Sequence, residues 1–291
     1  MILSFFRIFA HKYAWKYMSN TQIKKQKSPV AIWFRDTYKE IRIFVACYLL
    51  YLPYVIAFNL KYLPLSQSWK LPIWVRCRNR GAWKLNGKIR IDAKKVKCGM
   101  IKIGFKHDFY YKKGISYKNV RGLIIFKGSC QIGNESMLEV HPGAVLTFGD
   151  GFGASCSKIF CAQEVTFGDG TLLGFGTTVM DSDFHYIVDM IGRRFINPSA
   201  PVRIGNHNWV GCQTLIMKGT QTPDCCIIGA RAVLNKKYKV PKYSLIGNTQ
   251  SAQLIEEDYL LVPNNNPQGD PTRKLTQEEI GAMKQFYDNK E

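Results

Sequence analysis

Hydrophobic side chains recur at every sixth residue between residues 204 and 246. The positions are Ile204, Val210, Ile216, Thr222, Ile228, Leu234, Val240 and Ile246. A helix of 3.6 residues per turn would rotate each sixth side chain away from the one before it, so no buried stripe would persist. Short strands joined by tight turns repeat naturally at this length. Three hexads make one triangular coil, so the pattern predicts a parallel β-helix.

Glycine marks the predicted corners of this solenoid. Val210, Ile228 and Ile246 are spaced by one predicted coil of 18 residues, and glycine follows each of them, where we expect a corner to need a residue without Cβ. Less regular pairs run upstream: Ile103-Gly104, Ile132-Gly133, Phe148-Gly149, Phe167-Gly168 and Leu173-Gly174, with Val179 closing a second run. Since coils bury their cores only by stacking, we expect an all-β solenoid over residues 85–248, capped at both ends.

The chain before the solenoid has a different composition. Residues 1–42 combine aromatic with basic side chains, and residues 43–58 form an uncharged apolar run that Pro53 interrupts. This run is shorter than the about 20 residues of a spanning helix, which favours a re-entrant or in-plane helix on an anionic leaflet. The alternative is that residues 1–80 form ordinary amphipathic helices packed on the solenoid or at an oligomer contact. No cleavable signal pattern is evident.

Beyond the solenoid, residues 249–291 predict a linker rich in proline and asparagine, followed by a C-terminal helix. The helix is expected from Leu275 to Lys290, where apolar residues recur at rough helical spacing.

Composition and charge restrict the partners. The 291 residues are 46% hydrophobic, enough for one large core, and 41 basic against 21 acidic residues give a net charge of +20. Such a charge indicates an anionic partner: phospholipid, phosphorylated cofactor, acidic glycan or nucleic acid. Nucleic acid is disfavoured because no recognised binding module is present. Nine cysteines without a C-x-x-C motif fit a reducing cytosol and predict neither a disulfide framework nor a metal site.

Candidate chemistry lies where the hexads are interrupted. Between Val179 and Ile204 the repeat stops, which predicts an extruded loop over residues 181–201. It carries Asp181, Asp183 and His185, whose i, i+2, i+4 spacing would place them on one face of an extended chain. A carboxylate beside an imidazole can fix its tautomer and raise its basicity, as a general base requires. The alternative is a solvated surface histidine.

The C-terminal coils resemble a known family. Pro201–Gly211, Ile228–Ala230 and Ile246–Asn248 are similar to the last coils of hexapeptide-repeat O-acetyltransferases, which include maltose, galactoside and polysaccharide acetyltransferases. The resemblance covers about residues 120–250. It implies a left-handed parallel β-helix, a homotrimer, and acetyl-CoA bound between adjacent subunits. The Asp-x-Asp-Phe-His segment is most similar to capsular and exopolysaccharide acetyltransferases.

The resemblance also implies roles for particular residues. His185 would be the general base for the acceptor hydroxyl, and Asp183, or failing it Asp181, would orient the imidazole. The residues implied for cofactor binding are Trp209, Gly211, Cys212, Gly229, Ala230 and Lys236.

Three functions follow from these patterns. The first is an O-acetyltransferase that moves an acetyl group from acetyl-CoA to a sugar hydroxyl of a surface polysaccharide or its precursor. It would act in the cytoplasm, peripheral to the inner face of a bacterial membrane. The second is a metal-dependent glycosyltransferase, in which Asp181-Ser182-Asp183 would hold a divalent cation. The third is a non-catalytic β-helical scaffold at a membrane.

Overall fold

The structure is a computed structural model of the chain. It describes residues 51–77, 86–105, 114–185, 188–189, 194–195, 197–248 and 252–256, together with 278, 281–282 and 285. The chain divides into two compact units, Met1–Leu50 and Tyr51–Glu291, of which the first lies outside the described residues. The predictions for residues 1–50, and most of the predicted C-terminal helix, therefore stay predictions.

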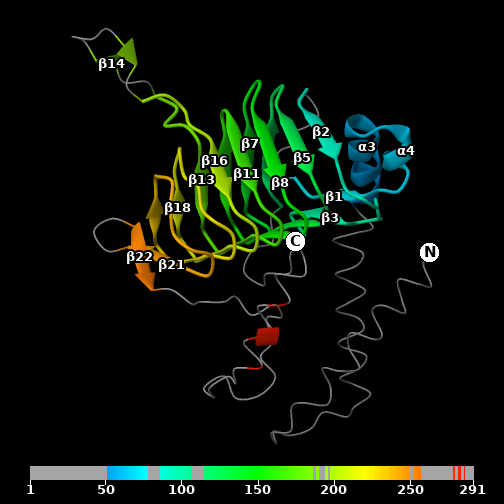
Figure 1. Cartoon of the computed structure of the whole chain (residues 1–291). Helices are drawn as coiled ribbons and strands as arrows, with labels where there is room; N and C mark the ends of the chain where they lie inside the picture. Colours follow the sequence, from blue (N-terminus) through cyan, green and yellow to red (C-terminus); the bar gives the residue numbers. More distant parts are fainter. Residues whose placement is uncertain are drawn as a thin grey trace, which may run out of the picture. The chain divides into compact units, whose positions relative to one another are not determined.

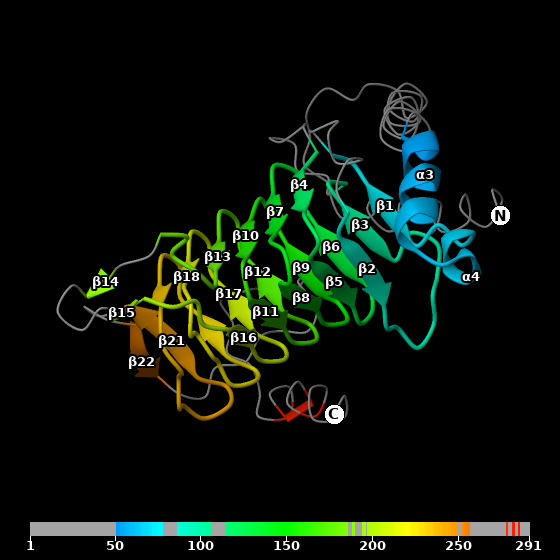
Figure 2. The ribbon, with the colours of Figure 1, turned by 90° about the horizontal axis from the view of Figure 1, so that it is seen from above.

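The second unit is a parallel β-helix with three faces (Figures 1 and 2). Among the described residues, its strands form three long sheets. The nine-stranded sheet contains β1 (Ile73–Val75), β3 (Ile101–Ile103), β6 (Cys130–Ile132), β9 (Phe152–Ala154), β12 (Leu172–Leu173), β17 (Trp209–Val210), β19 (Ile227–Ile228), β21 (Leu245–Asn248) and β22 (Ala252–Glu256). The six-stranded sheet contains β4 (Ser116–Asn119), β7 (Met137–Val140), β10 (Lys158–Cys161), β13 (Thr178–Met180), β18 (Leu215–Ile216) and β20 (Val233–Leu234). The five-stranded sheet contains β2 (Lys88–Ile91), β5 (Leu123–Phe126), β8 (Val145–Phe148), β11 (Glu164–Phe167) and β16 (Val202–Ile204).

The strand register confirms the all-β parallel solenoid predicted from the hexads. Val210 pairs with Ile228, and Ile228 pairs with Ile246, as the predicted coil length requires. All three side chains are buried. The solenoid begins at β1, with Ile73 and Val75 buried, earlier than the boundary expected near residue 85.

One hexad position, Val240, differs from the prediction. Gln221 bridges in parallel to Lys237, so the position after Gln221 aligns with Tyr238, which is buried, and not with Val240. The one non-aliphatic position, Thr222, also has its own explanation. Its hydroxyl accepts a hydrogen bond from the Gly205 amide at 3.2 Å, so a polar side chain is satisfied there.

Stacked phenylalanine rings fill the middle of the core. Phe126, Phe148 and Phe167 are in register on neighbouring strands, and their rings stack with centroids 5.3 and 5.7 Å apart. Phe152 packs against two of these rings. Since every coil presents its inward residues at the same register, stacking identical side chains fills the core without voids.

The expected need for a residue without Cβ holds at one of these corner glycines and not at another. The backbone at Gly211 is not left-handed; a Cβ there would lie 2.5 Å from the Ala230 amide nitrogen of the next coil, so close stacking excludes one. At Gly229 a Cβ would meet its nearest atom at 3.6 Å, an ordinary contact. The left-handed residues of these corners are Gln213 and Arg231, with φ of 57° and 60°.

Short elements close both ends of the solenoid. Helix α3 (Leu52–Tyr62) packs on the first coil, followed by α4 (Leu65–Ser68) (Figure 2). The fully buried Asn59 carboxamide donates to the carbonyl of Ile73 at 2.7 Å and accepts from its amide at 3.1 Å. At the other end, β22 pairs antiparallel with β21 and covers that sheet edge. Within the described residues, no helix has the length and hydropathy needed to cross a membrane.

Candidate active site

The predicted extruded loop leaves the solenoid after β13. Strands β11 and β13 pair directly with β16 and β18, so the coils stay continuous while the intervening chain is inserted at one corner. The loop contains β14 (Val188–Asp189) and β15 (Arg194–Phe195), which pair antiparallel. Its neck is closed by the amide of Ala200, which donates to the carbonyl of Asp181 at 3.0 Å.

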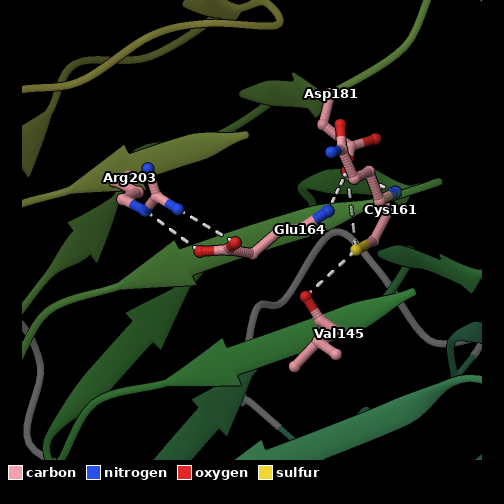
Figure 3. A network of polar contacts seen from close by, with 6 residues as sticks. Val145, Cys161, Glu164, Asp181 and Arg203 are labelled. Carbon is pink, nitrogen blue, oxygen red and sulfur yellow. Dashed lines mark hydrogen bonds and ion pairs between the residues drawn. The ribbon is translucent and has the colours of Figure 1, made fainter. Parts of the chain in front are cut away.

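The Asp181 carboxylate is built into the wall of the solenoid. It is fully buried and accepts hydrogen bonds from the amides of Ala162, Gln163 and Glu164 at 2.7, 2.8 and 2.7 Å (Figure 3). The Cys161 thiol donates to it at 3.8 Å, and burial raises the pKa of that thiol. Both carboxylate oxygens are therefore occupied in holding the corner between β10 and β11.

Figure 3 shows a second polar contact beside this corner. The Glu164 carboxylate accepts two hydrogen bonds from the Arg203 guanidinium, both at 3.0 Å. This bidentate pair joins β11 to β16 across the loop insertion. Because both side chains are partly exposed, we expect it to add little to stability.

Asp183 lies at the neck of the loop in a polar network. Its Oδ2 accepts from Lys218 Nζ at 2.6 Å and from Asn197 Nδ2 at 3.0 Å. The hydrogen bond from Lys218, followed by that from Asn197, holds the pKa of the Asp183 carboxyl below its usual value. Lys218 Nζ also donates to the Asn197 carbonyl at 3.1 Å, so one lysine ties both ends of the loop to the corner that follows β18.

His185 follows in the same network through its backbone. Asn197 Nδ2 donates to the His185 carbonyl at 2.7 Å, while the His185 side chain is exposed. The network therefore fixes the main chain that carries the imidazole.

The prediction that Asp181, Asp183 and His185 share one extended face is wrong. Phe184 has a φ of 59°, in the left-handed region, and its amide donates to the Ser182 hydroxyl at 3.1 Å. The chain turns there, so the spacing that would align the three side chains on a strand does not apply. Asp181 is buried inside the solenoid and His185 is outside it.

The turn places an aromatic side chain against the solenoid. The Phe184 ring lies 5.2 Å from the His141 ring and 6.1 Å from the Phe160 ring, measured between centroids. The residue after β7 and a residue of β10 thus support the turn before His185. A bulky residue with positive φ is uncommon and costs backbone strain, which is frequently found at functional sites.

Sequence reasoning missed two members of this network. Lys218 lies within the hexad repeat, so nothing in the sequence pattern singled it out. Strand register could have found it. Val179 pairs with Ile216, and Asp181 and Lys218 each lie two residues further along, so the two residues are neighbours on adjacent coils. Asn197 lies inside the predicted loop, and no motif marks it. Its position depends on the path of the whole loop, which no local pattern encodes.

The predicted cofactor residues fall at two corners. Trp209 is exposed on β17, and Gly211, Cys212, Gly229 and Ala230 stack at the corner that follows β17 and β19. In that corner the Gly211 amide donates to Ile228, and the Arg231 amide donates to the Cys212 carbonyl at 2.9 Å. Lys236 lies two residues beyond Leu234, at the next corner of the coil. Lys218 and the neck of the loop lie at this same corner. The six-stranded sheet separates the two groups.

Known proteins with similar sequence or structure include several that are named as acetyltransferases. No protein-family model matches the chain. A Mycobacterium tuberculosis protein named "Probable acetyltransferase Rv3034c" is 27% identical over 123 residues, which cover 39% of this chain and 38% of that protein. The chain thus aligns with less than two thirds of that relative's length.

Two solved structures are similar at lower identity. The polysialic acid O-acetyltransferase OatWY is 18% identical, with a TM-score of 0.42, over 70% of this chain and 94% of that one. A maltose O-acetyltransferase from Clostridium difficile 630 is 14% identical, with a TM-score of 0.35, over 71% of this chain and 84% of that one. At these values, the activity has to be argued from the residues of this chain.

Proposed function

We propose that this chain is an O-acetyltransferase that moves an acetyl group from acetyl-CoA to a sugar hydroxyl of a surface polysaccharide or its precursor. The observation that carries the proposal is the exposed side chain of His185, whose main chain is held at the loop neck by the Asp183, Asn197 and Lys218 network. The partial sequence match to a protein named as an acetyltransferase supports the same reaction class.

In the proposed reaction His185 is the general base. Its imidazole takes the proton from the acceptor hydroxyl, the oxygen attacks the thioester carbonyl, and the proton passes to the departing thiolate. Asp183 acts as a positioning residue through Asn197, which holds the His185 carbonyl. Asp181 acts only by fixing the corner from which the loop leaves.

The residues at the corner after β17 fit the donor. Trp209 offers an exposed ring, and Cys212 and Ala230 are exposed at the same corner, where a thin pantetheine arm would lie against them. Cationic Lys236 and the net charge of +20 suit the phosphates of CoA.

The separation of these residues supports a homotrimer. Within one chain, the six-stranded sheet lies between the His185 loop and the corner of Gly211 and Gly229. Two neighbouring subunits that pack corner against corner would bring one chain's loop to the other chain's glycines. A complete site would then require more than one copy.

The alternative of a metal-dependent glycosyltransferase fits the geometry poorly. Asp181 already accepts three backbone hydrogen bonds inside the solenoid, and Asp183 is paired with Lys218. The two carboxylates are not arranged to hold one cation, and no group of three metal-ligating side chains occurs among the described residues.

The experiment is free-thiol release from acetyl-CoA by the purified full chain, with and without simple glycosides as acceptors. We expect release that a chelator does not reduce, together with binding of acetyl-CoA in calorimetry that Trp209→Ala weakens. Activity that needs a divalent cation but no acetyl-CoA would support the glycosyltransferase instead. Absence of both binding and release would support the scaffold.

A further inference from the structure

Helix α3 is apolar on both of its faces. Its inner face places Phe58 in the solenoid core, and the buried polar residue on that face, Asn59, is satisfied by the backbone of β1. Its outer face presents Ile56 and Leu60, exposed by 39% and 53%. A surface helix of a soluble protein normally has a polar outer face, so this arrangement needs a partner on the outside.

The next helix continues the same kind of surface. Leu65 and Trp69, at the two ends of α4, are exposed by 76% and 71%. Of the eight exposed large hydrophobic side chains in the described part of the chain, four lie in this short segment. We call Ile56, Leu60, Leu65 and Trp69 the α3–α4 patch. Scattered exposed apolar residues are ordinary, but a cluster of this density marks an interaction surface.

The charge around the patch identifies the partner. Residues 51–77 contain Lys61, Lys70 and Arg76 and no acidic residue. Lys70 Nζ lies 5.5 Å above the Trp69 ring and Lys61 Nζ lies 5.1 Å above the Tyr62 ring, so both cations border the apolar surface. Tryptophan and leucine flanked by lysine suit the headgroup boundary of a bilayer, where the ring and the aliphatic chain enter the acyl region and the ammonium groups meet lipid phosphates.

We propose that the α3–α4 patch docks the solenoid onto the surface of an anionic lipid bilayer. The inference does not depend on acetyl transfer. It is narrower than the membrane association expected for residues 1–58, because the docking side chains lie on helices packed onto the first coil. In the part of the chain that the structure describes, no helix is long and apolar enough to span. The membrane would lie at the end of the solenoid where α3 and α4 cap it (Figure 2).

The test is co-sedimentation of the full chain with vesicles of phosphatidylcholine alone or with one quarter phosphatidylglycerol. The perturbed variant combines Leu60→Ser, Leu65→Ser and Trp69→Ser. The control combines Phe175→Ser and Val233→Ser, which removes exposed apolar side chains from the solenoid itself. Thermal unfolding checks that each variant is folded, and Trp69→Ser alone provides a milder change.

We expect the wild type and the control to sediment with anionic vesicles. The triple variant should bind at least about a hundredfold more weakly, since three large apolar side chains no longer enter the acyl region. Lys61→Gln with Lys70→Gln should weaken binding to anionic vesicles only, by about fivefold per lysine.

Other outcomes overturn the proposal. Unchanged sedimentation of the triple variant would assign any membrane binding to other parts of the chain. No sedimentation of the wild type would exclude a lipid partner. A concentration-dependent increase in molecular mass that the triple variant abolishes, without lipid binding, would make the patch a contact between copies of this chain.

Discussion

Removal of the Asp181 carboxylate should lower stability without removing the catalytic chemistry. Asp181→Ala would leave the amides of Ala162, Gln163 and Glu164 without their acceptor, and the carboxylate they lose is fully buried. Each unsatisfied buried donor costs about 1–3 kcal/mol. Because water can reach part of a corner, we expect a total loss of about 3–5 kcal/mol of unfolding free energy.

Asp181→Asn is the conservative test of the same interaction. The amide keeps one oxygen but turns an N–H group toward backbone donors, so we expect a loss of about 2 kcal/mol. In a domain of this size such losses lower the melting temperature by roughly 2–4 °C per kcal/mol, so Asp181→Ala should melt about 10 °C below the wild type. The control is Asp150→Ala. Asp150 accepts from the Ser129 amide and hydroxyl at an exposed corner, so its loss should cost about 1 kcal/mol or less.

The assay is thermal unfolding followed by circular dichroism, combined with acetyl transfer measured well below the melting temperature. We expect the folded fraction of Asp181→Asn to keep its kcat/KM. A variant that melts like the wild type but loses two orders of magnitude in kcat would refute the reasoning. It would return Asp181 to the role of imidazole partner.

Three further outcomes follow from the packing and the polar contacts. Phe148→Ala should cost about 3–5 kcal/mol, measured by urea unfolding, because the ring is fully buried between two stacked rings. Lys218→Met should raise the pKa of Asp183, measured by NMR titration of its carboxyl carbon. In the wild type, the ion pair between Asp183 and Lys218 is fully formed above the ordinary pKa of a carboxyl group, and it is lost as the pH falls through the lowered pKa of Asp183. An Asp183 pKa that is the same in Lys218→Met and in the wild type would contradict this role of Lys218. Asn59→Leu should leave both backbone groups of Ile73 unsatisfied and speed amide hydrogen exchange in β1, whereas unchanged exchange would show that α3 does not hold that strand.

The fold could be predicted because every coil has to bury its aliphatic side chains at the same position of the repeat. Val210, Ile228 and Ile246 occupy the same register in successive coils, and a solenoid buries them only at that spacing. The constraint weakens at the last coil, where Tyr238 takes the inward position near which Val240 was expected. The left-handed backbone at Gln213 and Arg231 could not be predicted, because glycine is the residue that usually indicates this conformation and neither position is a glycine.

The position of the candidate site along the chain could be predicted, but the contacts between its residues could not. The interruption of the hexads predicted the loop that carries His185. The prediction that Asp181, Asp183 and His185 share one face required an extended chain, whereas the chain turns at Phe184. The role of Asp181 depends on amides that precede it by almost one coil, and Lys218 reaches Asp183 from the coil that follows. Such contacts arise from the stacking of coils, so residue spacing within the loop does not encode them.

The most direct test of the proposed function compares two histidines in the full chain. Free-thiol release from acetyl-CoA is measured for His185→Asn and for His207→Asn, where His207 is a corner residue with φ of 54° that asparagine tolerates. The account predicts that His185→Asn loses at least about two orders of magnitude in kcat, while acetyl-CoA binding and His207→Asn stay near the wild type. Full thiol release by His185→Asn would contradict the assignment of His185 as the general base.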